Sequence, residues 1–371
     1  MAKLLMITGL GSVTDLASDR KGAFYNTLEE FHKYWDRIDI ISPCVRGQPI
    51  GEKIIFGNTH IHISKWPLFL HPLFFLSKGI ELYRINHFNL MTTQDYPPFY
   101  NGIGARLLWM KIRVPYILEI MHIPGHPRSA NFREWFYKQL TKVFVRFVAK
   151  KAVAVRVINK IQVPDFLTKH GVPREKLKYI PAFYIDLNIF KPLDLEKKYD
   201  LIFVGRLEPN KGLDLLLEVA QKSNLKILIV GTGPLYNDLR SQIENYNGGL
   251  FGLQDRHCNL SNISLHGFAK DSLEVAKLIN ESRALAMLSY NEGGPRVVLE
   301  ALACGVPVIA TSVGIVPDVI NRNNGVIVDW SAEDVIRAFE EIKDLKFKTD
   351  LSQFEKKLAI KNYADKLKEL I

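Results

Sequence analysis

Two glutamates, Glu292 and Glu300, carry the strongest chemical signal in the chain. Glu292 is followed by Gly293, Gly294, Pro295 and Arg296, and Glu300 lies within the apolar segment 297–303. The glycines and proline predict a turn that opens a helix, with Pro295 at its first position. A helix that is apolar on every face is buried, so the Glu300 carboxylate needs a polar partner.

The helix start also favours an anion, because the N–H groups of a first helical turn lack partners within the helix. Two carboxylates that accept from hydroxyls, beside an anion-binding helix start, suit a sugar nucleotide. The alternative is that Glu292 is an ordinary charge at a helix N-terminus and Glu300 a paired ion in the core.

Two cations lie at the end of the predicted buried strand 199–206: Arg206 is its last residue, and Lys211 follows five residues later. Both would leave the carboxyl edge of the sheet at the same strand, which suits a diphosphate. Solvated surface charge is the alternative for each of them. A later strand, 226–230, ends in Gly231-Thr232-Gly233, but Tyr236 stands where the third glycine of a dinucleotide fingerprint would be. That departure disfavours a nicotinamide dehydrogenase.

The first half of the chain adds two candidates, Gly22 and His122. Gly22 starts the helical pattern of residues 23–35, where a phosphate could approach closely; an ordinary turn is the alternative. His122 follows the strand pattern 116–121 and would reach a strand's carboxyl end, where ligands bind in parallel sheets. A histidine without a ligand role is equally compatible with that position.

The net charge of +10 belongs to the first half. Residues 1–190 hold 26 Lys and Arg against 14 Asp and Glu, whereas residues 191–371 hold 23 against 25. The predicted helix 131–151 alternates aromatic and aliphatic residues with Lys and Arg, a pattern compatible with an anionic lipid surface or with a solvated face. The apolar stretch 66–76 could likewise be buried or contact a membrane. We expect no nucleic-acid partner, because no DNA- or RNA-binding motif accompanies the charge.

Cysteine usage and hydropathy indicate a reducing compartment. Cys44, Cys258 and Cys304 are scattered, without the spacing of a zinc site or a disulfide framework. No apolar run reaches the ~18–20 residues that cross a bilayer, and the apolar run at the N-terminus is too short for a signal peptide. We therefore expect a cytoplasmic protein, with peripheral attachment to the inner face of the cell membrane as a hypothesis.

Strand and helix patterns recur twice, on either side of a proline-bounded linker at 179–192. Alternating strands and helices predict parallel sheets with helices on both faces. We expect an α/β fold of two Rossmann-like domains, residues 1–185 and 186–352. A final helix over residues 353–371 would pack back on the first domain.

The segment 199–342 resembles the retaining GT-B glycosyltransferases of family 4, which include phosphatidylinositol mannosyltransferases and sucrose-phosphate synthases; residues 1–190 resemble them more loosely. The resemblance rests on the Glu292-x7-Glu300 motif with 301–310 behind it, then on 203–212 and 231–234. It implies two domains facing each other across a cleft, with an N-terminal acceptor domain and a C-terminal donor domain.

The resemblance also implies roles for individual residues. Arg206 and Lys211 would bind the donor diphosphate, Glu300 the ribose, Glu292 the sugar, and His122 would face the donor across the cleft. Catalysis is expected from Glu292, His122, Arg206 and Lys211. Donor binding is expected from Gly22, Arg206, Lys211, Gly231, His266, Gly267, Phe268, Glu292, Gly293, Gly294, Pro295, Arg296 and Glu300.

The predicted activity is the transfer of a hexose from a nucleoside-diphosphate sugar, linked to UDP or GDP, to a lipid-linked or membrane-borne glycan. No metal or other cofactor is expected. A soluble transferase acting on a free sugar or sugar phosphate, or a non-catalytic sugar-nucleotide-binding protein, are the alternatives. Two departures from the family pattern concern the first domain and the linker: Lys21 replaces a paired glycine, and residues 181–186 differ from the usual Pro-Asn-Gly-Val-Asp.

Overall fold

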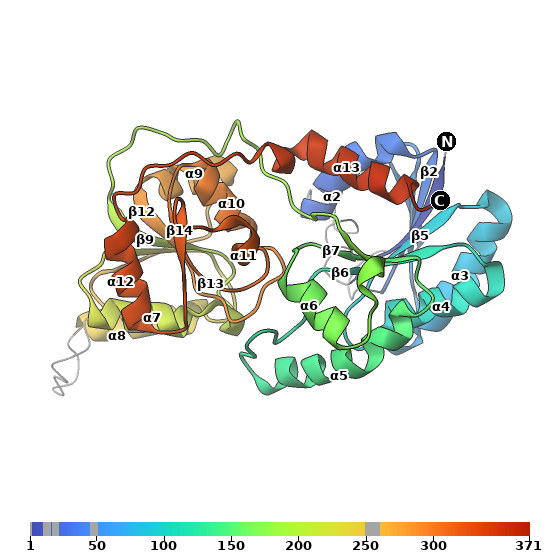
Figure 1. The fold of residues 1–371 in the computed structure, drawn as a ribbon, viewed down its shortest axis with the longest axis horizontal. Helices are drawn as coiled ribbons and strands as arrows, with labels where there is room; N and C mark the ends of the chain where they lie inside the picture. Colours follow the sequence, from blue (N-terminus) through green and yellow to red (C-terminus); the bar gives the residue numbers. More distant parts are fainter. Residues whose placement is uncertain (1, 10–15, 17–21, 45–50, 249–259) are drawn as a thin grey trace. The chain divides into compact units, whose positions relative to one another are not determined.

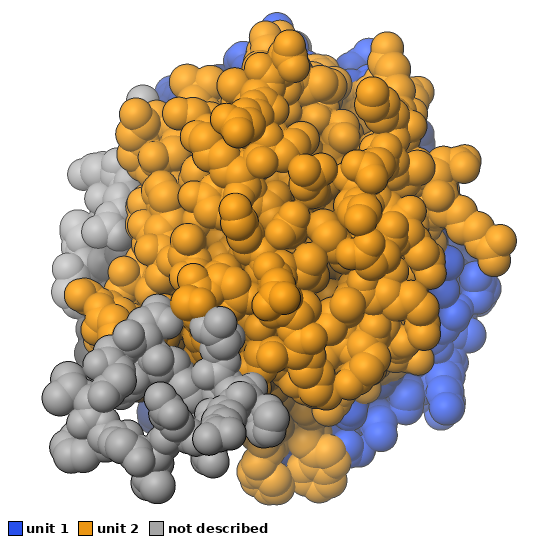
Figure 2. All heavy atoms as spheres, turned by 90° about the vertical axis from the view of Figure 1, so that its left-hand side faces the viewer, with its two compact units in different colours: residues 1–123, 136–182, 356–371 blue, residues 124–135, 183–355 orange. Residues whose placement is uncertain are grey.

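The computed structural model describes residues 2–9, 16, 22–44, 51–248 and 260–371. These residues form two compact units, coloured separately in Figure 2. Unit 1 comprises residues 1–123, 136–182 and 356–371, and unit 2 comprises residues 124–135 and 183–355. The boundaries expected from the sequence are 185/186 and 352/353, and residues 124–135 were expected in the first domain.

Unit 1 contains an eight-stranded sheet in the order β3-β4-β2-β1-β5-β6-β7-β8, in which β3 alone runs antiparallel to its neighbour. The strands of this sheet are β1 (Lys3–Ile7), β2 (Arg37–Ser42), β3 (Gly51–Ile55), β4 (Thr59–Ile63), β5 (Leu90–Gln94), β6 (Tyr116–Ile120), β7 (Ala154–Val157) and β8 (Leu177–Tyr179). The central strands are almost entirely buried, as expected when helices cover both faces of a parallel sheet.

Helices cover the two faces of this sheet in two groups. The helices are α2 (Ala23–Phe31), α3 (His71–Asn86), α4 (Tyr100–Ile112), α5 (Phe132–Ala149), α6 (Gln162–Lys169) and α13 (Lys356–Lys368), with short 3-10 turns at η1 (His32–Tyr34), η2 (Leu68–Leu70) and η3 (Arg174–Lys176). Figure 1 shows α2 and α13 on one face, and α3, α4 and α5 on the other. The chain moves from β1 toward one edge of the sheet and from β5 toward the other. Because crossovers are right-handed, the two directions place their helices on opposite faces.

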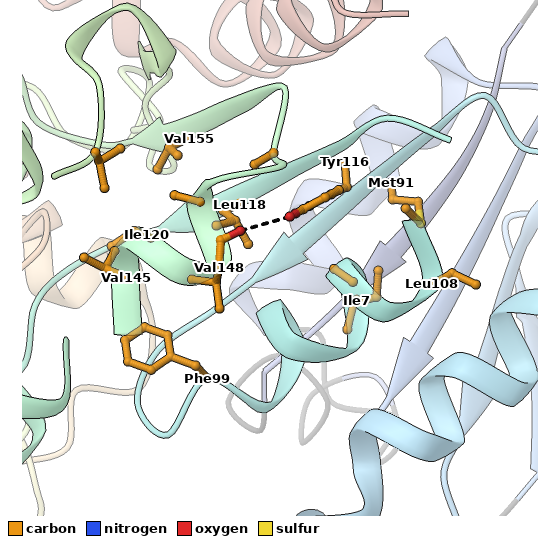
Figure 3. Packing of buried hydrophobic residues seen from close by; sticks show 14 of the residues in the cluster. Ile7, Met91, Phe99, Leu108, Tyr116, Leu118, Ile120, Val145, Val148 and Val155 are labelled. Atoms are coloured by element: carbon orange, nitrogen blue, oxygen red, sulfur yellow. Dashed lines mark hydrogen bonds between the residues drawn. The ribbon is translucent and has the colours of Figure 1, made fainter. Parts of the chain in front are cut away.

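The core of unit 1 lies between β6 and the helices α4 and α5. Figure 3 shows Val145 and Val148 of α5 pointing toward the strand residues Leu118 and Ile120. The Tyr116 hydroxyl donates to the Val148 carbonyl oxygen over 2.9 Å and so satisfies its hydrogen-bonding capacity inside the core. The apolar stretch 66–76 is divided: Phe75 is buried, whereas Phe69 and Leu73 are exposed.

Unit 2 contains a six-stranded parallel sheet in the order β11-β10-β9-β12-β13-β14. Its strands are β9 (Tyr199–Val204), β10 (Ile227–Val230), β11 (Ile263–Gly267), β12 (Ser282–Met287), β13 (Val308–Thr311) and β14 (Gly325–Val328). Its helices are α7 (Leu213–Lys222), α8 (Tyr236–Gly248), α9 (Ser272–Asn280), α10 (Arg296–Ala303), α11 (Val316–Val319) and α12 (Ala332–Ile342), with 3-10 turns η4 (Pro209–Lys211) and η5 (Ser352–Phe354).

The two chain segments that border unit 2 are paired with each other. The Ile185 N–H donates to the Phe354 carbonyl oxygen over 2.9 Å, and the Phe183 and Phe354 rings lie 5.7 Å apart. Phe183 and Ile185 belong to the segment 181–186, which departs from the Pro-Asn-Gly-Val-Asp pattern. Across the described residues, no helix is both long enough and apolar enough to span a membrane.

Candidate functional site

The connections in the sheet of unit 2 reverse direction between β9 and β12, and we call the region at the carboxyl ends of these two strands the crevice. These neighbouring strands pair in parallel, and the connections from them lead to opposite sides of the sheet. The loops that follow them therefore separate at the carboxyl edge, which is where open α/β sheets bind ligands. The loop after β9 carries Arg206 and Lys211, and the loop after β12 carries Glu292.

Backbone contacts join these two loops. The Tyr290 N–H donates to the Asn210 carbonyl oxygen over 2.8 Å, and the Asn210 side chain donates to the Asn291 carbonyl oxygen over 3.2 Å. Gly212 permits this approach: its φ is +68°, and a Cβ added there would lie 2.1 Å from the Leu288 carbonyl oxygen. A side chain at residue 212 would push the loops apart.

Lys211 and Glu292 form an ion pair in the crevice. The Lys211 ammonium donates to Glu292 Oε1, and the Ser289 hydroxyl donates to the same oxygen over 3.1 Å. The Lys211 and Glu292 side chains are 20% and 15% exposed, so both charges are only partly hydrated. From the sequence, Lys211 is expected at the diphosphate and Glu292 at the sugar; in the structure the two side chains contact each other directly.

Glu300 occupies the buried face of α10. Arg296 Nε donates to Glu300 Oε1 over 2.8 Å, which supplies the polar partner that a buried carboxylate requires. Burial raises the pKa of Glu300 above its ordinary value, although the Arg296 guanidinium opposes that shift. Pro295 is the residue that precedes α10 rather than its first helical residue, because its ψ of 101° is not helical.

A cavity of about 380 Å³ opens where β9, β10 and β11 end. Three predicted donor-binding residues line it: Arg206, Gly231 and Phe268. The Phe268 side chain is largely exposed, so its ring can stack on a planar ligand. The Arg206 guanidinium, also largely exposed, forms an ion pair with Glu208 over 2.6 Å.

Gly231 is required at the edge of this cavity for packing reasons. Its φ is +143°, and a Cβ added there would lie 1.8 Å from the Gly205 carbonyl oxygen. Its N–H donates to the Gly267 carbonyl oxygen over 2.7 Å, which ties together the ends of β10 and β11. His266 precedes that glycine and lies 3.6 Å from the Glu274 carboxylate.

Gly293 and Gly294 lie in the turn that precedes α10. A Cβ added at Gly294 would lie 2.2 Å from the Phe183 ring, so residue 294 is restricted to glycine by packing against the linker. The sequence analysis expected these glycines to expose N–H groups to the donor. That role in donor binding stays a prediction.

A larger groove of about 780 Å³ lies along β14 and α12 and is lined in part by Asp329, Asp334, Arg337 and Glu341. It contains none of the residues selected from the sequence, and β14 lies at the edge of the sheet rather than beside the β9–β12 crevice. The smaller cavity shares Arg206 with the crevice loops, and we therefore regard it as part of the candidate site.

Sequence reasoning missed the segment 124–135, which packs on the loop that carries Glu292. Asn291 is buried, and its side-chain amide donates to the Arg128 carbonyl oxygen over 3.0 Å and to Glu134 Oε2 over 2.9 Å. The Arg128 guanidinium lies 4.7 Å from the centre of the Tyr290 ring and 5.5 Å from that of Trp330. These contacts join residues more than 150 positions apart, and no local pattern in the sequence signals them.

The two remaining predicted residues belong to unit 1. His122 is exposed and follows β6 at the carboxyl edge of its sheet, as the strand pattern predicts. Gly22 is the residue that precedes α2; its φ of −79° is open to any residue, so the backbone there does not require glycine. Lys21 lies outside the described residues.

The described side chains do not gather into a metal-binding cluster. Within the described ranges, no group of three or more His, Cys, Asp or Glu residues is arranged to hold a metal ion. The described cysteines, Cys44 and Cys304, are unpaired, and Cys258 lies outside the described residues.

The chain is similar in sequence to known proteins over most of its length. The model of the family described as glycosyl transferases group 1 matches residues 185–366. A glycosyltransferase of Methanocaldococcus jannaschii is 27% identical over 330 residues, which are 83% of this chain and 75% of the relative. A phosphatidylinositol N-acetylglucosaminyltransferase subunit of Arabidopsis thaliana is 28% identical over 181 residues, which are 47% of this chain and 38% of the relative.

A solved structure shows the same fold. Anabaena Alr3699/HepE in complex with UDP and glucose aligns over 100% of both chains, with a TM-score of 0.69 and 15% sequence identity. The prediction of a GT-B fold is thereby confirmed.

Proposed function

Because this chain belongs to the group 1 glycosyltransferases, we propose that it moves a hexose from a nucleoside-diphosphate sugar to an acceptor with retention of anomeric configuration. The observation that carries this proposal is the Lys211–Glu292 pair in the β9–β12 crevice. One cation and one carboxylate meet there, and a nucleotide sugar offers phosphates to the cation and hydroxyls to the carboxylate.

The donor would extend from the cavity into the crevice. The base would stack on Phe268 at the cavity mouth, and the diphosphate would lie between Arg206 and Lys211. As the bond from the sugar to the diphosphate breaks, negative charge grows on the leaving group, and fixed cations stabilise it. Glu292 would accept from hydroxyls of the sugar, and Glu300 from those of the ribose.

We propose that this charge stabilisation needs no metal ion. The support is that three cations lie near the carboxyl ends of β9 and β12: Arg206 and Lys211 follow β9, and Arg296 is the first residue of α10. His122 is proposed as a further catalytic group, because it is exposed at the carboxyl edge of the unit 1 sheet. Changing His122 to alanine should abolish transfer and leave nucleotide binding to unit 2 intact.

The proposed donor is linked to UDP or GDP, and the proposed acceptor is a lipid-linked or membrane-borne glycan. The complex of HepE with UDP and glucose supports a uridine nucleotide. The name of the Arabidopsis relative supports a lipid acceptor, as does the excess of Lys and Arg in residues 1–190. We propose accordingly that the protein works in the cytoplasm, peripherally at the inner face of the cell membrane.

Transfer of radiolabelled hexose tests this proposal. The purified protein would be incubated with a panel of labelled UDP- and GDP-sugars and a lipid extract, and label in the organic phase would be counted. We expect label from one donor, lost in Glu292→Gln and retained in Glu341→Gln, which makes the same change in the groove along β14. Label confined to water-soluble products would favour a sugar or sugar-phosphate acceptor. Nucleotide binding without transfer to any acceptor would favour a non-catalytic protein.

A further inference from the structure

Helix α5 has two apolar faces, one buried in unit 1 and one partly exposed. Its inner face carries Thr141, Val145, Val148 and Ala149, which are all buried. Figure 3 shows Val145 and Val148 on that face, turned toward β6. Burial of this face is what a helix that connects β6 to β7 requires.

The second face points away from the core. Phe136, Val143 and Phe147 are 46%, 71% and 50% exposed. Phe144 beside them is 40% exposed, and one side of its ring stacks on the buried Phe99 ring, with 6.2 Å between the ring centres. Positions 136, 143 and 147 lie on one side of a helix, because residues three, four and seven apart share a face. We call Phe136, Val143, Phe144 and Phe147 the outer stripe.

The charge around the outer stripe has one sign. From residue 136 to residue 153 the chain contains Lys138, Lys142, Arg146, Lys150 and Lys151, and no Asp or Glu. Helix α4 adds Arg106, whose guanidinium lies 3.9 Å from the centre of the Phe147 ring. Lys and Arg therefore flank an exposed row of apolar side chains.

We propose that the outer stripe of α5 docks this protein on the surface of an anionic lipid bilayer. The aromatic and aliphatic side chains would enter the boundary between headgroups and acyl chains, and the flanking cations would contact lipid phosphates. A bilayer would contact both the apolar outer stripe and the flanking cations, whereas a nucleic acid would leave the outer stripe in water. A second copy of the chain would bring like charges together across the same face. The proposal deepens the proposed function, on which it rests for the identity of the acceptor, but docking is measurable without transfer.

Vesicle co-sedimentation of the full chain tests the proposal. At low salt we expect the protein to pellet with vesicles of phosphatidylcholine and phosphatidylglycerol, and not with phosphatidylcholine alone. Raising the salt should release it, because exposed charges are screened over about 8 Å at 0.15 M ionic strength. The double change Phe136→Asn and Val143→Asn should weaken binding at least about tenfold, since it removes apolar surface that the bilayer would bury.

A matched control makes the same change at two exposed aliphatic residues of unit 1 outside the outer stripe. Ile54→Asn with Leu358→Asn alters β3 and α13, and α13 covers the other face of the sheet (Figure 1). This variant should bind vesicles as the wild type does. Wild-type protein that ignores anionic vesicles, or a stripe variant that binds them undiminished, would overturn the proposal. So would a dimer in solution that the stripe variant loses, because a second copy would then cover the face.

Thermal stabilisation by nucleotides separates this proposal from the proposed function. A stripe variant that loses vesicle binding but is still stabilised by a nucleotide is folded, and it supports docking through α5. Vesicle binding without stabilisation of the wild type by any nucleotide would contradict the proposed function and leave the docking surface standing.

Discussion

The ion pair of Lys211 and Glu292 joins two loops whose residues are 81 positions apart in the sequence. The pair exists because β9 and β12 are neighbours and because Gly212 allows their loops to touch. Within the protein the two charges satisfy each other. A bound nucleotide sugar would instead place its phosphates against the ammonium and its hydroxyls against the carboxylate.

Replacing Lys211 by alanine should lower kcat by about 10²–10³, the usual effect of removing one group that stabilises transition-state charge. The fold should survive, because the pair is at the sheet edge and Glu292 keeps the Ser289 hydroxyl as a partner. Initial rates with the donor found in the labelling experiment would measure the effect. Lys277→Ala removes an exposed lysine of α9 and serves as the control. Equal rates in the two variants would contradict the assignment of Lys211.

Asn291 should act as a positioning residue for Glu292. Its amide holds the backbone next to Glu292 through Arg128 and Glu134, so Asn291→Ala should lower kcat about tenfold or more by misplacing the carboxylate. Stabilisation by the nucleotide alone, which the crevice cations and the cavity provide, should remain. Steady-state kinetics and nucleotide melting curves on one preparation would measure both.

Changes at Glu134, the partner of Asn291, test whether Asn291 positions Glu292. Glu134→Gln keeps an oxygen that accepts from Asn291, whereas Glu134→Ala removes it. We expect the glutamine variant to retain most of the rate and the alanine variant to resemble Asn291→Ala. Equal losses in both glutamate variants would show that the carboxylate charge, and not its acceptor oxygen, is what matters.

At the scale of elements, α13 is fixed to unit 1 by a buried polar cluster. Arg156 donates to Glu119 Oε1 over 2.9 Å and lies 3.8 Å from the centre of the Tyr363 ring. The Tyr363 hydroxyl donates to the same carboxylate, and Arg156 also donates to the backbone oxygens of Ile180 and Pro181. The cluster thus connects β6, β7 and the chain leaving β8 to the last helix.

Removing the carboxylate of that cluster should be severe. Glu119→Ala leaves the Arg156 charge buried without its partner, which costs about 3–5 kcal/mol of unfolding free energy. Tyr363→Phe removes one hydrogen bond and should cost about 0.5–1.5 kcal/mol, or somewhat more because its acceptor is charged. Urea unfolding followed by circular dichroism would rank the two variants. A Glu119→Ala protein as stable as wild type would contradict the arrangement.

Asp95, which directly follows β5, should make stability depend on pH. Burial raises the pKa of Asp95 to about 8, although the backbone N–H groups of Gly102 and Tyr96 favour the charged form. The folded state then holds a proton that the unfolded state, with a pKa near about 3.9, has lost. The contribution of Asp95 to stability is therefore full below about pH 4 and is lost as the pH rises to about 8.

Asp95→Asn isolates that contribution, because the variant cannot titrate at this position. The melting temperature of the variant minus that of wild type should rise between pH 5 and pH 8. The reason is that wild type loses the stability contributed by protonated Asp95 over this range, whereas the variant does not. Differential scanning fluorimetry across this range would measure it. A difference that is constant with pH would show that Asp95 keeps an ordinary pKa in the fold.

Elements whose side chains follow one clear pattern could be predicted from the sequence. The strand expected over residues 116–121 is observed as β6 (Tyr116–Ile120), because a strand buried in a parallel sheet is a short apolar run. The expected helix over residues 23–35 ends at Phe31 and continues as a 3-10 turn. Strand β3 was missed, since an exposed edge strand that mixes charged and apolar residues gives no alternating signal.

The residues of the candidate site also fall into two groups. Arg206, Lys211 and Glu292 could be selected from the sequence because they follow predicted strands, and Glu300 because it is a lone carboxylate in an apolar helix; their roles stay predictions. The contacts of Arg128 and Asn291 could not be predicted in this way, because they depend on how segment 124–135 packs within unit 2. Contacts between residues far apart in the sequence leave no local pattern. A positioning role also does not restrict a residue to one amino-acid type.

At the scale of the whole molecule, the sheets of the two units have a similar strand arrangement, and the two halves of the chain differ in net charge. In each, the first strand lies near the centre of the sheet, with later strands added on both sides, so each has a switch point at its carboxyl edge. The excess of Lys and Arg belongs to the half of the chain that also carries the outer stripe of α5. Donor binding is proposed for unit 2, and membrane docking for unit 1.

Binding of a nucleotide sugar to the crevice of unit 2 is measured most directly by the melting temperature of the purified full chain. A ligand that binds only the folded state raises the unfolding free energy by about 2.7 kcal/mol at one hundred times its dissociation constant. We predict that one nucleoside diphosphate and its sugar, from a panel of UDP, GDP and ADP compounds, raise the melting temperature of wild type and of Lys277→Ala but not of Lys211→Ala. No rise with any compound, or an equal rise in Lys211→Ala, would contradict the donor site.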